Sequence, residues 1–119
     1  MSAVALLGHA QRVIREPRRD ALSSRMAAFL ARQALEVIVD ERCTDLGAPA
    51  AWASMRTKLA VLRSLDAEEA ADSAAIAWSR LSNACHVHAF ELQPSAAEVQ
   101  HLCGLVASLL RVPDPPQSC

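Results

Sequence analysis

Three polar residues that together could cleave a phosphodiester lie at helical spacing late in this sequence of 119 residues. They are Arg80, Asn83 and His86, each three positions from the next. A histidine titrates near neutral pH and can move a proton to or from a hydroxyl group. An arginine can stabilise charge on phosphorus in the transition state, and an asparagine can orient either group. This spacing predicts a catalytic site that needs no metal ion.

The helix expected over residues 67–91 has two apolar faces. We assign one of them to the protein core, and it carries Ala67, Ala70, Ala74, Ala77, Trp78, Leu81, Cys85 and Leu92. The opposite face carries Ile76, Val87 and Phe90, and Ile76, Asn83 and Phe90 are seven residues apart, as in a helical seam. Either the last helix of the chain or a second copy of the chain could cover this face. A symmetric dimer would bring a second Arg80 and His86 to the site.

The segment from Trp78 to His86 resembles the HEPN (higher eukaryotes and prokaryotes nucleotide-binding) superfamily, whose members are small helical bundles with an Arg followed a few residues later by a His. Many are dimeric, metal-independent ribonucleases that act as toxins or phage-defence effectors. The resemblance covers residues 3–111 at the level of the fold and implies that Arg80 and His86 form the catalytic pair. In the usual pattern a polar residue follows the Arg directly, whereas here Leu81 does and the Asn comes at position 83.

Two functions follow from these residues. One is a HEPN-like homodimer that cleaves RNA in a toxin or defence setting, with an antitoxin or another protein as a partner. The other is a non-catalytic helical dimer that binds a protein partner through the face around Ile76, Val87 and Phe90. An enzyme should hold its two His86 side chains close together in an open cleft, whereas a binding module should bury or separate them.

Cysteines and histidines gather near the same helix end, and Cys85, His88 and Cys103 are the weak candidates for metal ligands. Zinc requires four such groups, or three and a water. The spacing of C-H-x-H with H-x-C is not one that zinc sites use, and free cysteine is often buried as a small hydrophobic residue. We therefore expect no metal ion and no cofactor.

The composition indicates an all-α protein. The chain has 24 Ala, three Gly and no Tyr, which favours helices and disfavours a β-sandwich or barrel. We expect an antiparallel up-and-down bundle of four main helices plus one shorter helix. Residues 1–111 should form a single domain, and residues 112–119, with three Pro, a disordered tail.

Apolar periodicity predicts helices over residues 3–15, 20–42, 49–65 and 67–91 and a last helix after Ser95. Three helix faces are expected to be apolar: one with Leu22, Met26, Phe29 and Val37, one with Trp52, Met55, Leu59 and Leu62, and one with Val99, Leu102, Cys103, Val106, Leu109 and Leu110. Pro49 is expected to open the third helix. Asp66 with Glu69, and Ser95 with Glu98, have the spacing of capping boxes.

The charge is unevenly distributed, at +4 for residues 1–63 and −5 for residues 64–119. A basic patch comprises Arg12, Arg15, Arg18 and Arg19. It could contact the phosphates of a nucleic acid, or it could cap a helix and face acidic groups of the second half. The sequence shows no targeting signal and no apolar run of the length that a membrane span needs, so we expect a cytoplasmic protein with reduced thiols.

Overall fold

The chain is helical wherever the structure describes it, apart from the connections. The computed structural model describes residues 2–16, 21–85 and 94–110. These ranges contain the helices α1 (Ala3–Arg15), α2 (Ala21–Asp45), α3 (Met55–Leu65), α4 (Glu68–Cys85) and α5 (Ala96–Ser108). The all-α prediction is confirmed, while the tail expected over 112–119 lies outside the described residues. None of the helices in these ranges has the length and apolar content required to cross a membrane.

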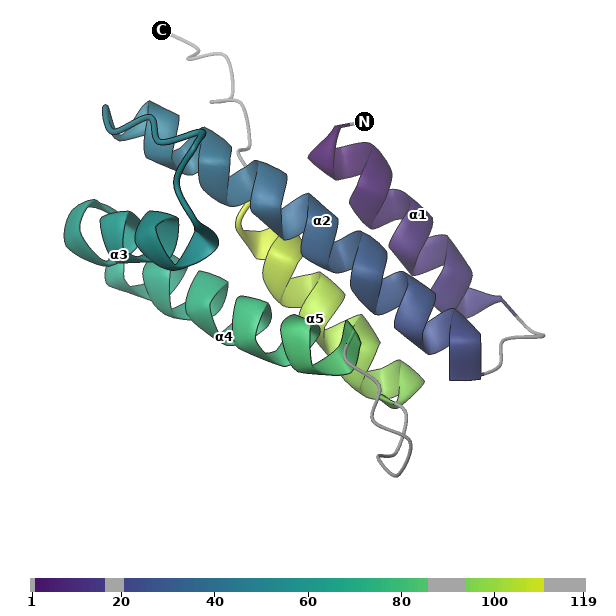
Figure 1. Ribbon diagram of the computed structural model, residues 1–119. Helices are drawn as coiled ribbons and strands as arrows, with labels where there is room; N and C mark the ends of the chain where they lie inside the picture. Colours follow the sequence, from purple (N-terminus) through teal and green to yellow (C-terminus); the bar gives the residue numbers. More distant parts are fainter. Residues whose placement is uncertain (1, 17–20, 86–93, 111–119) are drawn as a thin grey trace, which may run out of the picture.

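Helix α2 is the centre of the fold and contacts each of the other four helices. Figure 1 shows α2 running across the molecule, with α1 along one side and α4 along the other. Helix α5 contacts α1, α2 and α4, and α3 packs against α2 and α4. Helices α1 and α4 do not contact each other through their described residues, because α2 and α5 lie between them.

Alanines allow the central helices to pack closely. Ala31 and Ala34 of α2 and Ala74 and Ala77 of α4 are completely buried. Because the side chain of alanine is a single carbon, two helix axes can approach to about 8 Å, the lower limit of the usual range. The buried side of α4 matches the predicted core face at Ala74, Ala77 and Leu81, whereas Ala67 at the predicted start is exposed.

Helix α5 follows its prediction closely. Ser95 is its N-cap, and its hydroxyl accepts a hydrogen bond from the Glu98 backbone N–H at 3.0 Å. The predicted core residues Val99, Leu102, Cys103, Val106 and Leu109 are buried, and Leu110 is half-buried. The cap and the apolar stripe are both local in sequence, which is why the pattern predicts them well.

Helix α3 begins later than predicted. Ser54 is its N-cap and accepts a hydrogen bond from the Thr57 backbone N–H at 3.2 Å, so the helix starts at Met55 rather than Pro49. Trp52, expected on a packing seam, lies before the helix and is 87% exposed. The prediction for residues 49–54 is therefore wrong, because the serine cap satisfies the first turn and these residues form turns and a bend instead.

Asp66 was expected to cap α4, but most of its hydrogen bonds come from Arg42 rather than from the start of α4. Its carboxylate oxygens accept hydrogen bonds from Arg42 Nε at 2.7 Å and Nη2 at 3.0 Å. Arg42 Nη1 also donates to the Leu109 carbonyl at 2.9 Å. Toward α4, Asp66 accepts only the adjacent Ala67 N–H, at 2.8 Å. Asp66 is thus mainly the partner of Arg42, and the hydrogen bonds from Arg42 lower the pKa of its carboxyl.

Candidate functional site

The described part of the outward face of α4 is exposed, as predicted. Ile76 is 47% exposed, and Arg80 and Asn83 are exposed on the same side of the helix. Ala74 and Leu81, on the opposite side, are completely buried. We call Ile76, Arg80 and Asn83 the α4 face. An apolar side chain of this size beside two exposed polar groups is a feature of surfaces that contact another molecule.

Arg80 is available to bind an anion. It forms no ion pair or hydrogen bond with any described residue. A guanidinium without an acidic neighbour keeps its donors free for a carboxylate or a phosphate. His86, Val87 and Phe90, which complete the predicted site and interface, lie outside the described residues.

Arg32 on α2 supports the flank of α4 near this face. Its guanidinium carbon lies 4.2 Å from the centroid of the Trp78 ring, and its Nε donates to Ser82 Oγ at 3.1 Å. Arg32 and Glu36 have the i,i+4 spacing of a helical ion pair, and they form one at 4.0 Å. The sequence suggested only the local Glu36 contact, because nothing in it places Trp78 or Ser82 beside α2. The Arg32 contacts fix α4 against α2 and so orient the α4 face outward.

The predicted basic patch is described in part. Arg12 and Arg15 are exposed in the last turn of α1, while Arg18 and Arg19 lie outside the described residues. Arg15 Nε donates to the Gln11 carbonyl at 3.2 Å, which holds the Arg15 side chain along its own helix. The Nε of Arg15 is thus engaged within α1, whereas Arg12 has no hydrogen bond or ion pair with any described residue.

The weak metal candidates are placed beside different helices. Cys85 lines a pocket of about 330 Å³ with Arg25, Met26 and Phe29 of α2, whereas Cys103 faces α1. Burial raises the pKa of both thiols, for Cys103 to about 11. His88 lies outside the described residues, and the described residues contain no group of three or more His, Cys, Asp or Glu side chains that could hold a metal ion.

Two residues of the pocket beside Cys85 show that the predicted buried face of α2 is wrong. Met26 and Phe29 were expected on a buried face, but they are 55% and 48% exposed. The buried side of this part of α2 is formed by Ala27, Ala28 and Ala31 instead. Periodicity predicted the helix correctly, but it predicted that the larger side chains would be buried. The neighbouring helices approach α2 so closely that its alanines are buried instead.

Comparison of the chain with protein-family models, curated proteins and solved structures found no match.

Proposed function

We propose that this protein is a HEPN-like homodimer that cleaves RNA without a metal ion, in the cytoplasm and in a toxin or defence setting. The observation that carries this proposal is the α4 face, where Arg80 and Asn83 are exposed beside the apolar Ile76. The predicted seam and the predicted catalytic residues coincide there. An apolar surface whose polar groups are exposed, with no partner among the described residues, suits an interface with an active site within it.

In the proposed mechanism, each residue of the trio has one task. His86 takes the proton from the 2′-hydroxyl of a ribose or returns a proton to the leaving oxygen. Arg80 stabilises the charge that develops on the phosphoryl oxygens, and its freedom from any described acidic partner leaves it fully available. Asn83 orients the substrate or the imidazole. The second copy supplies the second proton-transfer group, because one trio contains a single histidine.

We also infer the antiparallel up-and-down arrangement of the bundle. Figure 1 supports it, since the end of α1, the start of α2, the end of α4 and the start of α5 lie at one end of the molecule. Arg12 and Arg15 belong to the last turn of α1, so they lie at the same end of the molecule as the end of α4. In this proposal, the basic patch of Arg12, Arg15, Arg18 and Arg19 holds the RNA backbone while the α4 face performs the cleavage.

The test is cleavage of single-stranded RNA by the purified protein in the presence of EDTA. Arg80→Gln and His86→Ala should each lower the rate by about a hundredfold or more, the usual contribution of one acid–base or electrostatic group. Arg56→Gln is the matched control, because Arg56 is an exposed arginine of α3. Equal cleavage by wild type and His86→Ala would show that any observed activity has another source.

A second candidate function uses the same surface without catalysis. The Ile76 side chain of α4 is apolar and 47% exposed. Such a side chain favours a protein partner, for example an antitoxin, docked on the face around Ile76, Val87 and Phe90. If wild-type protein does not cleave RNA but Ile76→Asp abolishes binding to a co-purified partner, the binding function is the correct one.

A further inference from the structure

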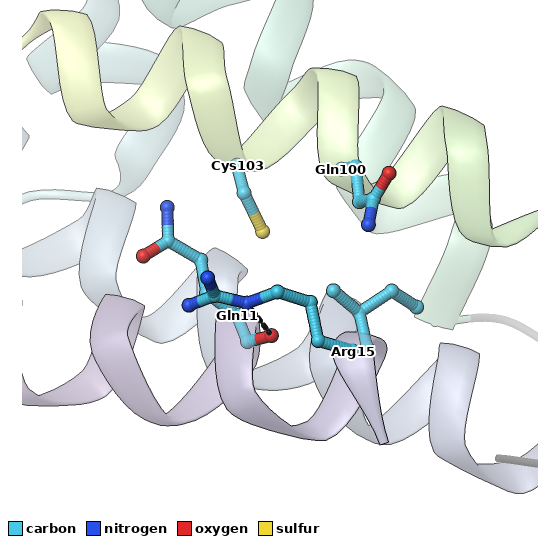
Figure 2. Close-up of a pocket in the computed structure, with 5 residues that line it drawn as sticks. Gln11, Arg15, Gln100 and Cys103 are labelled. Carbon is cyan, nitrogen blue, oxygen red and sulfur yellow. Dashed lines mark hydrogen bonds between the residues drawn. The ribbon is translucent and has the colours of Figure 1, made fainter. Parts of the chain in front are cut away.

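A pocket between α1 and α5 combines an apolar floor with a polar rim. It has a volume of about 240 Å³ and is lined by Gln11, Ile14 and Arg15 of α1 and by Gln100 and Cys103 of α5. Figure 2 shows the labelled side chains converging on the space between the two helices. This pocket includes no residue of the α4 face. It shares Arg15 with the basic patch that is proposed to hold the RNA backbone, whereas its other lining residues have no role in either proposed function.

The floor of the pocket suits a hydrocarbon group. Ile14 and Cys103 are each 1% exposed, and the Cys103 sulfur points into the space between the helices. Burial raises the pKa of this thiol to about 11, so it remains uncharged at neutral pH. The floor therefore offers an apolar wall and a neutral, polarisable sulfur.

The rim of the pocket suits one planar anion. Arg15 Nε is engaged with the Gln11 carbonyl, which holds the guanidinium along α1 (Figure 2). Its two terminal amino groups have no acidic partner among the described residues. These groups present parallel N–H donors that match the two oxygens of a carboxylate. The amides of Gln11 and Gln100, also without a described partner, line the same pocket and offer it neutral donors and acceptors.

We propose that this pocket binds a small organic carboxylate. The carboxylate lies on the terminal amino groups of Arg15, its apolar body covers Ile14 and Cys103, and the two glutamine amides meet polar substituents. A carboxylate fits better than a phosphate, because Arg15 is the one cation among the described residues that line the pocket, and a dianion needs more than one. The volume lies below the range of about 300–1,000 Å³ for drug-sized ligands, so the ligand should be small.

The test uses benzoate as the probe, with benzamide as its uncharged analogue and inorganic phosphate as a second anion. Backbone amide shifts of the ¹⁵N-labelled full chain are followed during titration. We expect saturable benzoate binding with a Kd on the order of 1 mM. The shifts should centre on α1 around Gln11 to Arg15 and on α5 around Gln100 to Cys103, with benzamide at least about tenfold weaker.

Variants test whether benzoate binds in this pocket or is only attracted to the basic end of α1. Arg15→Gln should weaken benzoate binding at least about tenfold, while Arg12→Gln, on the same helix but outside the pocket, should change it less than about twofold. If circular dichroism shows that Arg15→Gln alters the fold, Gln100→Ala on α5 is used in its place. We expect Gln100→Ala to weaken benzoate binding about threefold. The proposal is overturned by absent binding at roughly 20 mM benzoate, by equal effects of the two arginine variants, or by phosphate binding as tightly as benzoate at the same residues.

Discussion

Among single residues, Arg42 does the most to join separate parts of the chain. It holds Asp66, at the junction of α3 and α4, with two nitrogens and the carbonyl of Leu109, the C-cap of α5, with a third. Only a guanidinium can do this, because its donors lie in fixed directions, whereas an ammonium is a point charge. The Asp66 side chain is 10% exposed and the Arg42 side chain 21%, so the pair is sheltered from water.

Asp66→Asn should therefore destabilise the protein by about 1.5–3 kcal/mol at pH 7, the usual worth of hydrogen bonds to a charged group. Because the folded-state pKa of Asp66 is lowered, its contribution is present above the unfolded pKa and is lost as the pH falls through the folded value. The difference between wild type and variant in urea unfolding should thus shrink below about pH 4. Asp72→Asn, which removes the exposed partner of Arg63, is the control and should cost under about 1 kcal/mol. A difference that does not change with pH would contradict this assignment.

Cys103 should be chemically inert in the folded protein. Burial raises the pKa of its thiol to about 11, and only the thiolate is nucleophilic. We expect iodoacetamide at pH 8 to alkylate Cys103 at least about a hundredfold more slowly in native protein than in urea. Mass spectrometry of the digested protein would measure each cysteine separately. Equal rates in the two conditions would show that α5 opens readily or that the thiol is not buried.

The range of an interaction decides whether a residue's role can be predicted from sequence. Ser95 was predicted as a cap, and its partner Glu98 is three positions away. Asp66 had the same local pattern, yet its main partner Arg42 lies 24 positions earlier. A capping motif records which local bonds are available, whereas the tertiary fold decides which of the competing partners is used.

At the scale of elements, periodicity predicts the helices better than their ends or their buried faces. Helix α1 has the predicted bounds, but α3 starts at Met55 because Ser54 caps it. On α2, Met26 and Phe29 match an apolar stripe, while the neighbours of α2 pack against its alanines. Side-chain size is a poor guide to burial where helices approach closely, since only small residues fit there.

The caps give an element-scale prediction. Ser95→Ala should destabilise the protein by about 1 kcal/mol, because the Glu98 N–H loses its acceptor at the start of α5. Ser95→Gly should destabilise it by only about 0.3 kcal/mol, because glycine is also a favourable N-cap residue. Thermal and urea unfolding of both variants would measure the difference. Equal losses for the two variants would indicate that the serine contributes through something other than the cap.

At the scale of the whole molecule, composition predicted the all-α fold class, whereas the sequence did not predict the ion pairs that join the two halves of the chain. The basic first half and the acidic second half meet at Arg42–Asp66 and at Arg63–Asp72. In the proposed function, the candidate site depends on a second molecule, which the sequence of one chain does not identify. Ile76, Arg80 and Asn83 are exposed on α4, and the identity of the surface that meets them follows from assembly rather than from periodicity.

The oligomeric state is therefore the decisive whole-molecule prediction. Wild-type protein should dimerise through the α4 face, and Ile76→Asp should raise the dimer Kd by about 30-fold or more in sedimentation equilibrium, as expected for a charge placed at the centre of an apolar interface. Met26→Asp is the matched control, because Met26 has a similar exposure, 55% against 47%, but lies on α2. If Met26→Asp dissociates the dimer and Ile76→Asp does not, the interface lies on α2 instead. A wild-type protein that stays monomeric would leave one His86 in each site, with no second proton-transfer group, and the surface would then be better explained by a protein partner.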